Sequence, residues 1–268
     1  METEARERWR AHLESWAAPL HLGGGSDPIN QPDYASLVTP PGTDPDGART
    51  PTEMAVAHMG GDNASVIDVS VGTERIGPTL ARRGHRVSAV AADPDEAQAL
   101  TSQGRITGLV GIWPVIASNA GTHDVALSTH AAYGVPAIGP FIEALHRIAR
   151  RGVVLEVTPK HPMTALGRAI RLLHGHDVPK RPTADDLEAA AREATGSDIH
   201  TERWTAPAAP RFSELADLLT HYRTLLRIPP DRSIEASGIL ERDVHTTDDG
   251  AFVLGPVERH LTTLWWRT

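Results

Sequence analysis

The sequence predicts an α/β protein built on a doubly wound, mostly parallel β-sheet, with an N-terminal helix and C-terminal helical additions. Short apolar runs rich in β-branched residues alternate with helical segments between residues 65 and 158, which is the pattern of successive βαβ units. One of these runs, residues 66–69, passes directly into a turn of small residues and then into a helix. Such a strand–turn–helix presents backbone amides at a helix N-terminus. We therefore expect a ligand-binding α/β domain.

The alternating region predicts five strands and three helices. Strands are expected at 65–70, 86–91, 106–110, 124–129 and 152–158, and helices at 74–83, 94–102 and 138–150. Right-handed crossovers place the ligand of such a sheet at the carboxyl ends of the strands, near the point where the strand order reverses. Residues that follow these strands are therefore the candidates for the site.

Residues 1–60 are predicted to form a helical cap and a connection ahead of an α/β domain at 61–268. Trp9 and Trp16 lie at helical spacing, so both indoles occupy one helix face. Packing onto the domain is the expected role of this face, and a lid over a ligand pocket is the alternative. The predicted parts are a helix at 3–17, an irregular Gly-, Pro- and Asp-rich connection at 21–50 and a short helix at 51–59.

Beyond Thr158 the pattern changes to amphipathic helices. They are predicted at 163–174, 183–194 and 212–226, within helical insertions at about 163–195 and 212–241. Thr183 and Asp186 have the spacing of an N-terminal capping pair. Residues 251–254 and 261–266 are apolar, and we expect them to form an antiparallel hairpin at the edge of the sheet.

Composition excludes several classes of function. The chain has 268 residues, a formal net charge of −8 and no cysteine. A general nucleic-acid surface needs a basic face, and thiolate chemistry needs cysteine, so neither is expected. The charged N-terminus and the lack of a long apolar run predict a soluble, cytoplasmic protein that does not bind membranes. The expected partner is a small molecule, and the oligomeric state stays open.

The 14 histidines do not form a recognisable metal motif. His174 and His176 have no third ligand at a motif spacing, and the chain contains no HExxH sequence. It also lacks the Gly-x-Ser-x-Gly elbow of serine hydrolases. We therefore expect neither a metal site nor a serine nucleophile.

Several segments together resemble one family. The stretch Val66-Ile-Asp-Val-Ser-Val-Gly-Thr-Glu74 is similar to motif I of class I S-adenosylmethionine (SAM) methyltransferases, with Ser70 and Glu74 in place of two glycines. Further similar segments are residues 7–17, Gly111-Ile-Trp-Pro114, 128–136, 151–162 and Leu264-Trp-Trp266. With these, the chain resembles actinobacterial class I methyltransferase-like proteins over most of its length. The resemblance implies a seven-stranded, Rossmann-like sheet and SAM as the cofactor.

The resemblance also implies which residues contact SAM. An acidic residue that ends the second strand usually binds the ribose hydroxyls in this family. Ala91 stands at that position here, and Asp93 is its substitute if the loop is shifted by two residues. The residues expected around the methionine part are Asp68, Ser70, Gly72 and Thr73.

Further candidates lie at the ends of the third, fourth and fifth strands. Trp113 and Ser128 are expected to bind the cofactor, and the candidate catalytic group is His130, Tyr133 and Glu156. Trp113 lies where this family binds the adenine, so its indole is expected either to stack on the base or to pack in the core. Ser128 ends the fourth strand, beside the position of the methyl group. His130 is the preferred general base because histidine titrates near neutral pH, with a structural role at a helix start as the alternative. Tyr133 and Glu156 complete the group, and a structural ion pair is the alternative role of Glu156.

The function that these residues favour is SAM-dependent methylation of an oxygen or nitrogen atom on a small molecule. The alternative is a non-catalytic or repurposed methyltransferase-fold protein with lost or weakened SAM binding. The changes at Ser70, Glu74 and Ala91 motivate that alternative. Such a protein would bind a partner or metabolite, or catalyse a reaction other than methylation, because a fold does not fix a function.

Overall fold

The computed structural model describes residues 4–17, 47–70, 75–160, 162–175, 182–207 and 210–268. Its main sheet consists of β1 (Ser65–Asp68), β2 (Arg86–Ala91), β3 (Ile106–Val110), β4 (His123–Thr129), β5 (Ala149–Val157), β6 (His200–Pro207) and β9 (Glu258–Arg267). These strands lie in the order β3-β2-β1-β4-β5-β9-β6. Strands β1 to β5 are parallel, and β9 is antiparallel to both of its neighbours. The predicted seven-stranded, doubly wound fold is confirmed.

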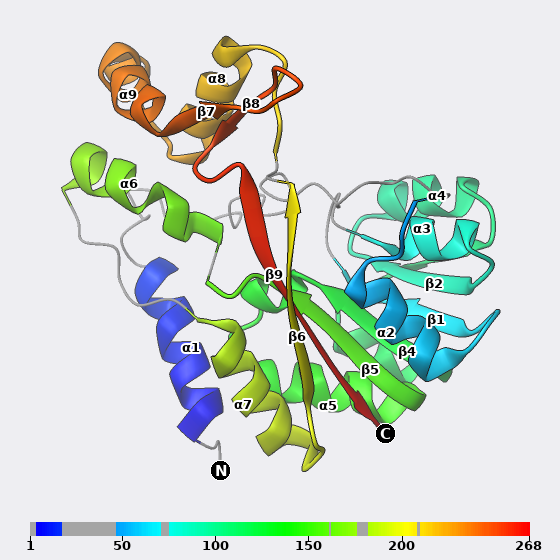
Figure 1. Ribbon diagram of the computed structural model, residues 1–268. Coiled ribbons are helices and arrows are strands. Elements are labelled where there is room, and N and C mark those ends of the chain that lie inside the picture. Colours follow the sequence, from blue (N-terminus) through cyan, green and yellow to red (C-terminus); the bar gives the residue numbers. More distant parts are fainter. Residues whose placement is uncertain (1–3, 18–46, 71–74, 161, 176–181, 208–209) are drawn as a thin grey trace.

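Helices cover both faces of the sheet (Figure 1). On one face lie α2 (Pro51–Gly60), α3 (Gly77–Arg82) and α4 (Pro94–Ser102). On the other lie α1 (Glu4–Ala17), α5 (Ile138–Ile148) and α7 (Ala184–Thr195). Alternate residues of the central strands feed the two cores, as period-two side-chain alternation requires. In the region 65–158, the predicted strands and helices end within three residues of the observed ones.

The predicted C-terminal hairpin is wrong. Residues 252–254 form β8 (Phe252–Leu254), which pairs with β7 (Val244–Thr246) in a separate two-stranded sheet. Strand β9 instead lies between β5 and β6, where Leu261, Leu264 and Trp266 are fully buried. Strand β6 was not predicted because its sequence is mostly polar, and an edge strand needs few apolar residues.

The N-terminal helix is docked firmly against the domain. The Trp9 side chain is fully buried, and its Nε1 donates to the carbonyl of Val135 at 2.9 Å. The Arg8 guanidinium pairs with Asp186 at 2.8 Å, and Asp186 also closes the capping box of α7 with Thr183. This arrangement supports the packing role expected for Trp9. The side chain of Trp16 lies outside the described residues.

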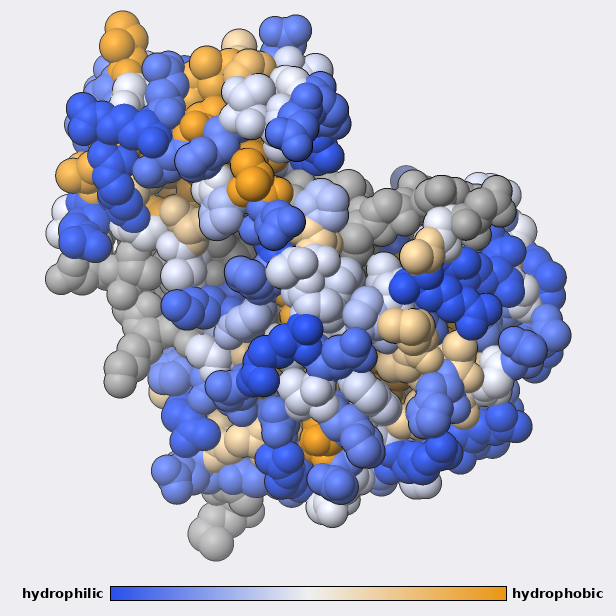
Figure 2. Space-filling view, viewed as in Figure 1, coloured by the Kyte–Doolittle hydropathy of each residue, from blue (hydrophilic) through white to orange (hydrophobic). Residues whose placement is uncertain are grey.

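A separate group of helices and strands from the C-terminal half of the chain, here called the cap, extends beyond one end of the sheet. It consists of α6 (Gly167–His174), α8 (Leu215–Leu225), α9 (Ser233–Leu240), β7 and β8. Figure 1 shows it beyond the end at which β6 leaves the sheet. Because β6 and β5 are both antiparallel to β9, this is the carboxyl end of the parallel strands. The molecular outline is indented between this cap and the part of the sheet that carries α3 and α4 (Figure 2).

Trp266 tests how strongly β9 is integrated into the core. Its Nε1 bonds to Nδ1 of His146 at 3.1 Å, and the side chain is fully buried. We expect Trp266→Ala to lower the free energy of unfolding by about 3–5 kcal/mol, measured by urea denaturation, because it leaves a large cavity. The control Ile234→Ala removes a side chain that is 91% exposed and should cost less than about 0.5 kcal/mol. A Trp266→Ala loss no larger than the control's would contradict this position.

Candidate functional site

The strand order reverses between β1 and β4, so the ligand crevice expected for a sheet of this kind lies at their carboxyl ends. Two side-chain hydrogen bonds connect the carboxyl ends of β1, β4 and β5. The backbone N–H of Thr129 donates to Oγ of Ser70 at 2.9 Å, which joins the ends of β4 and β1. The side chain of His130 meets Glu156 of β5 at 3.2 Å. The crevice is therefore bordered by residues that the sequence singled out.

Asp68 connects the end of β1 with the start of α3. Its carboxylate is fully buried and accepts the N–H of Ser70 at 2.9 Å and the N–H of Gly77 at 3.1 Å, one on each of its oxygens. A Cβ at position 77 would lie 2.3 Å from Oδ2, so only glycine allows this approach. Gly77 was not among the predicted residues. Gly72 and Thr73 lie outside the described residues.

Neither of the two candidates at the end of β2 presents a free carboxylate at the strand end. Ala91 is buried and apolar. Asp93 is exposed, and its Oδ1 accepts the N–H of Asp95 at 2.7 Å as the N-cap of α4. The predicted ribose contact of each therefore stays a prediction.

A guanidinium instead occupies the end of β2. Arg75 donates through one terminal nitrogen to the carbonyl of Val90 at 2.5 Å, and through Nε to Oε1 of Glu96 at 3.2 Å. Its other terminal nitrogen lies 4.0 Å from Oδ1 of Asp68. That nitrogen is buried and has no hydrogen-bond acceptor in the part of the chain that the structure describes. Arg75 and Glu96 were missed because 21 residues separate them, and no local spacing marks the pair.

His130 and Glu156 form a buried pair at the ends of β4 and β5. Their side chains are each 3% exposed, and His130 adopts a left-handed backbone with φ 58°. Such a conformation costs a non-glycine residue free energy and often marks functional positions. Oε2 of Glu156 accepts a short hydrogen bond from the hydroxyl of Thr52 in α2. The pair therefore joins two strands and a helix that lie far apart in the sequence.

Burial and hydrogen bonding set the charge of this pair. Burial lowers the pKa of His130, against the opposing effect of Glu156. Burial by itself would raise the pKa of Glu156, but hydrogen bonds from His130 and Thr52 and the charge of Arg259 lower it. At neutral pH we therefore assign an ionised carboxylate and a neutral imidazole, with the proton on Nε2 directed at Glu156.

Of the two aromatic candidates, Tyr133 packs against His130, and Trp113 packs in the core. Tyr133 is buried; its ring stacks on His130 with a centroid separation of 6.4 Å and on Trp9 at 6.3 Å. Its hydroxyl donates to the carbonyl of Thr158 at 2.8 Å. Trp113 is 7% exposed, and its Nε1 donates to the carbonyl of Phe141 at 3.2 Å, which favours the packing role. Adenine stacking by Trp113 stays a prediction.

Ser128 is the residue before the last one of β4, and it contacts the segment after β1. It is buried, and its hydroxyl donates to the carbonyl of Val69 at 3.4 Å. With the Thr129–Ser70 bond, it is the second side-chain hydrogen bond between the ends of β1 and β4. The position agrees with the expected one, and a contact with the methyl group stays a prediction.

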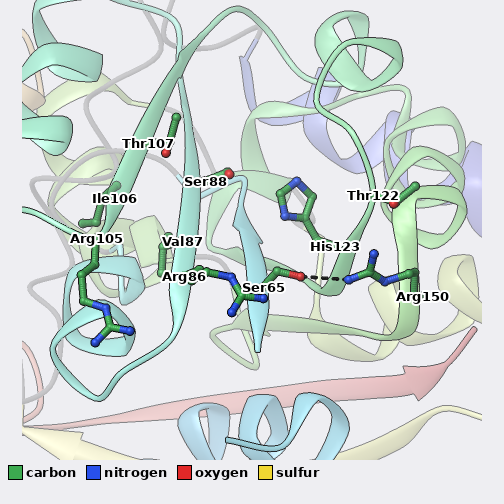
Figure 3. A pocket seen from close by; sticks show the side chains of 10 residues that line it. All are labelled: Ser65, Arg86, Val87, Ser88, Arg105, Ile106, Thr107, Thr122, His123 and Arg150. Atoms are coloured by element: carbon green, nitrogen blue, oxygen red, sulfur yellow. Dashed lines mark hydrogen bonds between the residues drawn. The ribbon is translucent and has the colours of Figure 1, made fainter. Parts of the chain in front are cut away.

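A groove of about 610 Å³ lies at the opposite, amino end of the strands (Figure 3). The Arg150 side chain points toward Ser65 there and donates to its hydroxyl at 3.2 Å. Burial raises the pKa of Asp124, but hydrogen bonds from Ser65 and Arg150 outweigh it and lower the pKa to about 2. The groove is lined by Ser65, Arg86, Val87, Ser88, Arg105, Ile106, Thr107, Thr122, His123 and Arg150. It contains none of the predicted site residues.

The described ranges contain no group of three or more histidine, aspartate or glutamate side chains placed to hold a metal ion. None of the described helices is long and apolar enough to cross a membrane.

Comparison with known proteins gives a fold. No known protein-family model matches the chain, and no curated protein matches it in sequence. A candidate methyltransferase from an antibiotic biosynthesis pathway of Anabaena variabilis has a TM-score of 0.52 at 14% identity, over 78% of this chain and 94% of that one.

Two further solved structures show weaker similarity. The YcgJ protein of Bacillus subtilis has a TM-score of 0.49 at 12% identity, over 81% of this chain and 97% of that one. A candidate methyltransferase of Bacillus halodurans has a TM-score of 0.47 at 12% identity, over 80% and 96%. The strand order and the similarity to the Anabaena structure both support the same conclusion. The chain has the Rossmann-like fold of class I SAM-dependent methyltransferases.

Proposed function

We propose that the protein is a SAM-dependent methyltransferase that methylates an oxygen or nitrogen atom of a small molecule. The buried His130–Glu156 pair, at the carboxyl ends of β4 and β5, carries this proposal. In this fold the ligand crevice lies beside that pair. A carboxylate-oriented imidazole next to a ligand site is the arrangement of a general base.

The described residues fit a nucleoside-bearing cofactor in the crevice. Asp68 accepts the N–H groups of Ser70 and Gly77, and the buried terminal nitrogen of Arg75 has no acceptor among the described residues. A buried donor without an acceptor costs free energy, which a ligand oxygen would recover. Asp68, Ser70 and Ser128 would border the methionine half, and Arg75 the nucleoside half. SAM supplies an activated methyl group when it is bound.

His130 would take the proton that the methyl acceptor loses. Its lowered pKa keeps the imidazole neutral at pH 7, and the ionised Glu156 holds Nε2–H, so Nδ1 is the basic nitrogen. Glu156 also stabilises the imidazolium that forms when an acceptor hydroxyl or amine releases its proton. Tyr133 stacks on the ring and restricts its orientation. Otherwise the reaction requires mainly that the two reactants be held in line in a dry site.

The cap is the proposed acceptor pocket. Its helices α6, α8 and α9 stand at the carboxyl end of the sheet, the end at which the crevice opens. The net charge of −8 disfavours nucleic acid as the acceptor and supports a small molecule.

A non-catalytic or repurposed protein is the second candidate. It is favoured by one observation: the buried apolar Ala91 and the Arg75 guanidinium lie where a carboxylate is expected to bind ribose. In that case the crevice would bind a different metabolite, or the chain would act through a partner.

Calorimetric titration of the ligand-free protein with SAM and with S-adenosylhomocysteine separates the two candidates. We expect dissociation constants on the order of micromolar, which corresponds to about −8 kcal/mol. The physical reasons are the hydrogen bonds of Asp68 to the N–H groups of Ser70 and Gly77, and the buried Arg75 nitrogen that has no acceptor among the described residues. Absence of binding at millimolar ligand would reject the methyltransferase proposal and favour the second candidate.

His130→Gln tests the proposed base, using an acceptor found by screening for S-adenosylhomocysteine release. We expect kcat to fall by about 10²–10⁴-fold, with little change in S-adenosylhomocysteine affinity. Because burial lowers the pKa of His130, wild-type kcat should be at its plateau at pH 7 and decline only below about pH 6.5. The control His58→Gln changes an exposed histidine on α2 and should retain full activity. An unchanged kcat in His130→Gln would remove His130 from the mechanism.

A further inference from the structure

We propose that Glu96, held in place by Arg75, is the carboxylate that binds the ribose hydroxyls of the cofactor. This inference rests on the proposed SAM-binding function and extends it to a residue on α4. It explains how a chain with Ala91 at the end of β2 can still recognise a nucleoside.

A ribose presents two neighbouring hydroxyls, each of which donates one hydrogen bond. A carboxylate matches them because it offers two acceptor oxygens and no donor. In Rossmann-type folds this carboxylate stands near the end of the second strand. Here Ala91 has no polar side chain, and Asp93 is committed to the N-terminus of α4. The requirement therefore falls on another acid near the same point.

Glu96 is that acid. It lies in the first turn of α4, three residues after the N-cap Asp93. Its Oε1 accepts from Nε of Arg75 at 3.2 Å, and its side chain is 37% exposed. Its second oxygen forms no hydrogen bond within the described ranges. The carboxylate is therefore oriented by one oxygen and can accept from a ligand through the other.

Arg75 links Glu96 to the end of β2, because it bonds to both. The guanidinium is 5% exposed and bonds to the carbonyl of Val90, the residue before the last one of β2. Its remaining terminal nitrogen, which has no acceptor among the described residues, lies 4.0 Å from Oδ1 of Asp68. The guanidinium is thus held between β2 and Asp68, and Glu96 is oriented by its Nε.

The charges of this cluster suit SAM. Two carboxylates, of Asp68 and Glu96, surround one guanidinium, which leaves one net negative charge beside the crevice. SAM carries a sulfonium and an ammonium group against one carboxylate, so its net charge is positive. The cluster is therefore complementary to the cofactor despite the arginine.

Glu96→Gln tests the assignment by titration calorimetry with S-adenosylhomocysteine. The amide keeps the size of the side chain but replaces one acceptor oxygen by a donor. We expect affinity to fall about tenfold to a hundredfold, the effect of losing a charge-assisted hydrogen bond. The control Asp95→Asn changes the neighbouring acid, which is exposed in the same turn, and should bind as the wild type does. Thermal unfolding of each variant verifies that it is folded.

The 2′-deoxy analogue of S-adenosylhomocysteine separates ribose recognition from a structural effect. Wild-type protein should bind this analogue more weakly than S-adenosylhomocysteine, and Glu96→Gln should lose most of that discrimination. The analogue and the substitution remove the same hydrogen bond, one from the ligand and the other from the protein. If Glu96→Gln binds as tightly as the wild type, or discriminates equally well, the assignment is wrong while the proposed function stands. If the wild type binds neither ligand, both proposals fail.

Discussion

The carboxylate of Asp68 is the constraint on which the crevice depends. It is fully buried, and it accepts one backbone N–H from each side of the turn between β1 and α3. A buried charge of this kind persists only when its hydrogen-bonding capacity is used. The need for Gly77 follows from this, since any side chain there would collide with the carboxylate. Arg75 then balances part of the charge and extends the cluster to β2 and α4.

A second buried network ties the N-terminal part of the chain to the proposed base. Thr52 of α2 donates to Glu156 and lies 2.7 Å from the hydroxyl of Thr263 in β9. Nε1 of Trp204 in β6 donates to the same Thr263 hydroxyl at 3.0 Å. The hydrogen bond from Thr52 lowers the pKa of Glu156, which favours the ionised carboxylate in the interior. The partner of His130 thus contacts α2, and α2 in turn contacts β9.

The cap is attached at the same end of the sheet as these networks. The chain leaves β6, forms α8, α9, β7 and β8, and returns to the sheet as β9. In the proposed function this cap forms the acceptor pocket. Binding residues often lie on connecting segments that a rigid scaffold holds in place.

The sequence by itself determined the fold class and the residues at the strand ends. Hydrophobic periodicity and turn residues are local properties, so the elements between 65 and 158 could be predicted closely, and Asp68, His130 and Glu156 stand at the ends of predicted strands. Tertiary structure decided which polar groups meet. Thr52 and Glu156 are 104 residues apart, and Arg75 reaches Glu96 across 21. Long-range pairs depend on how helices and strands pack, which no local spacing encodes. For the same reason the polar strand β6 and its pairing with β9 emerged only in the folded chain.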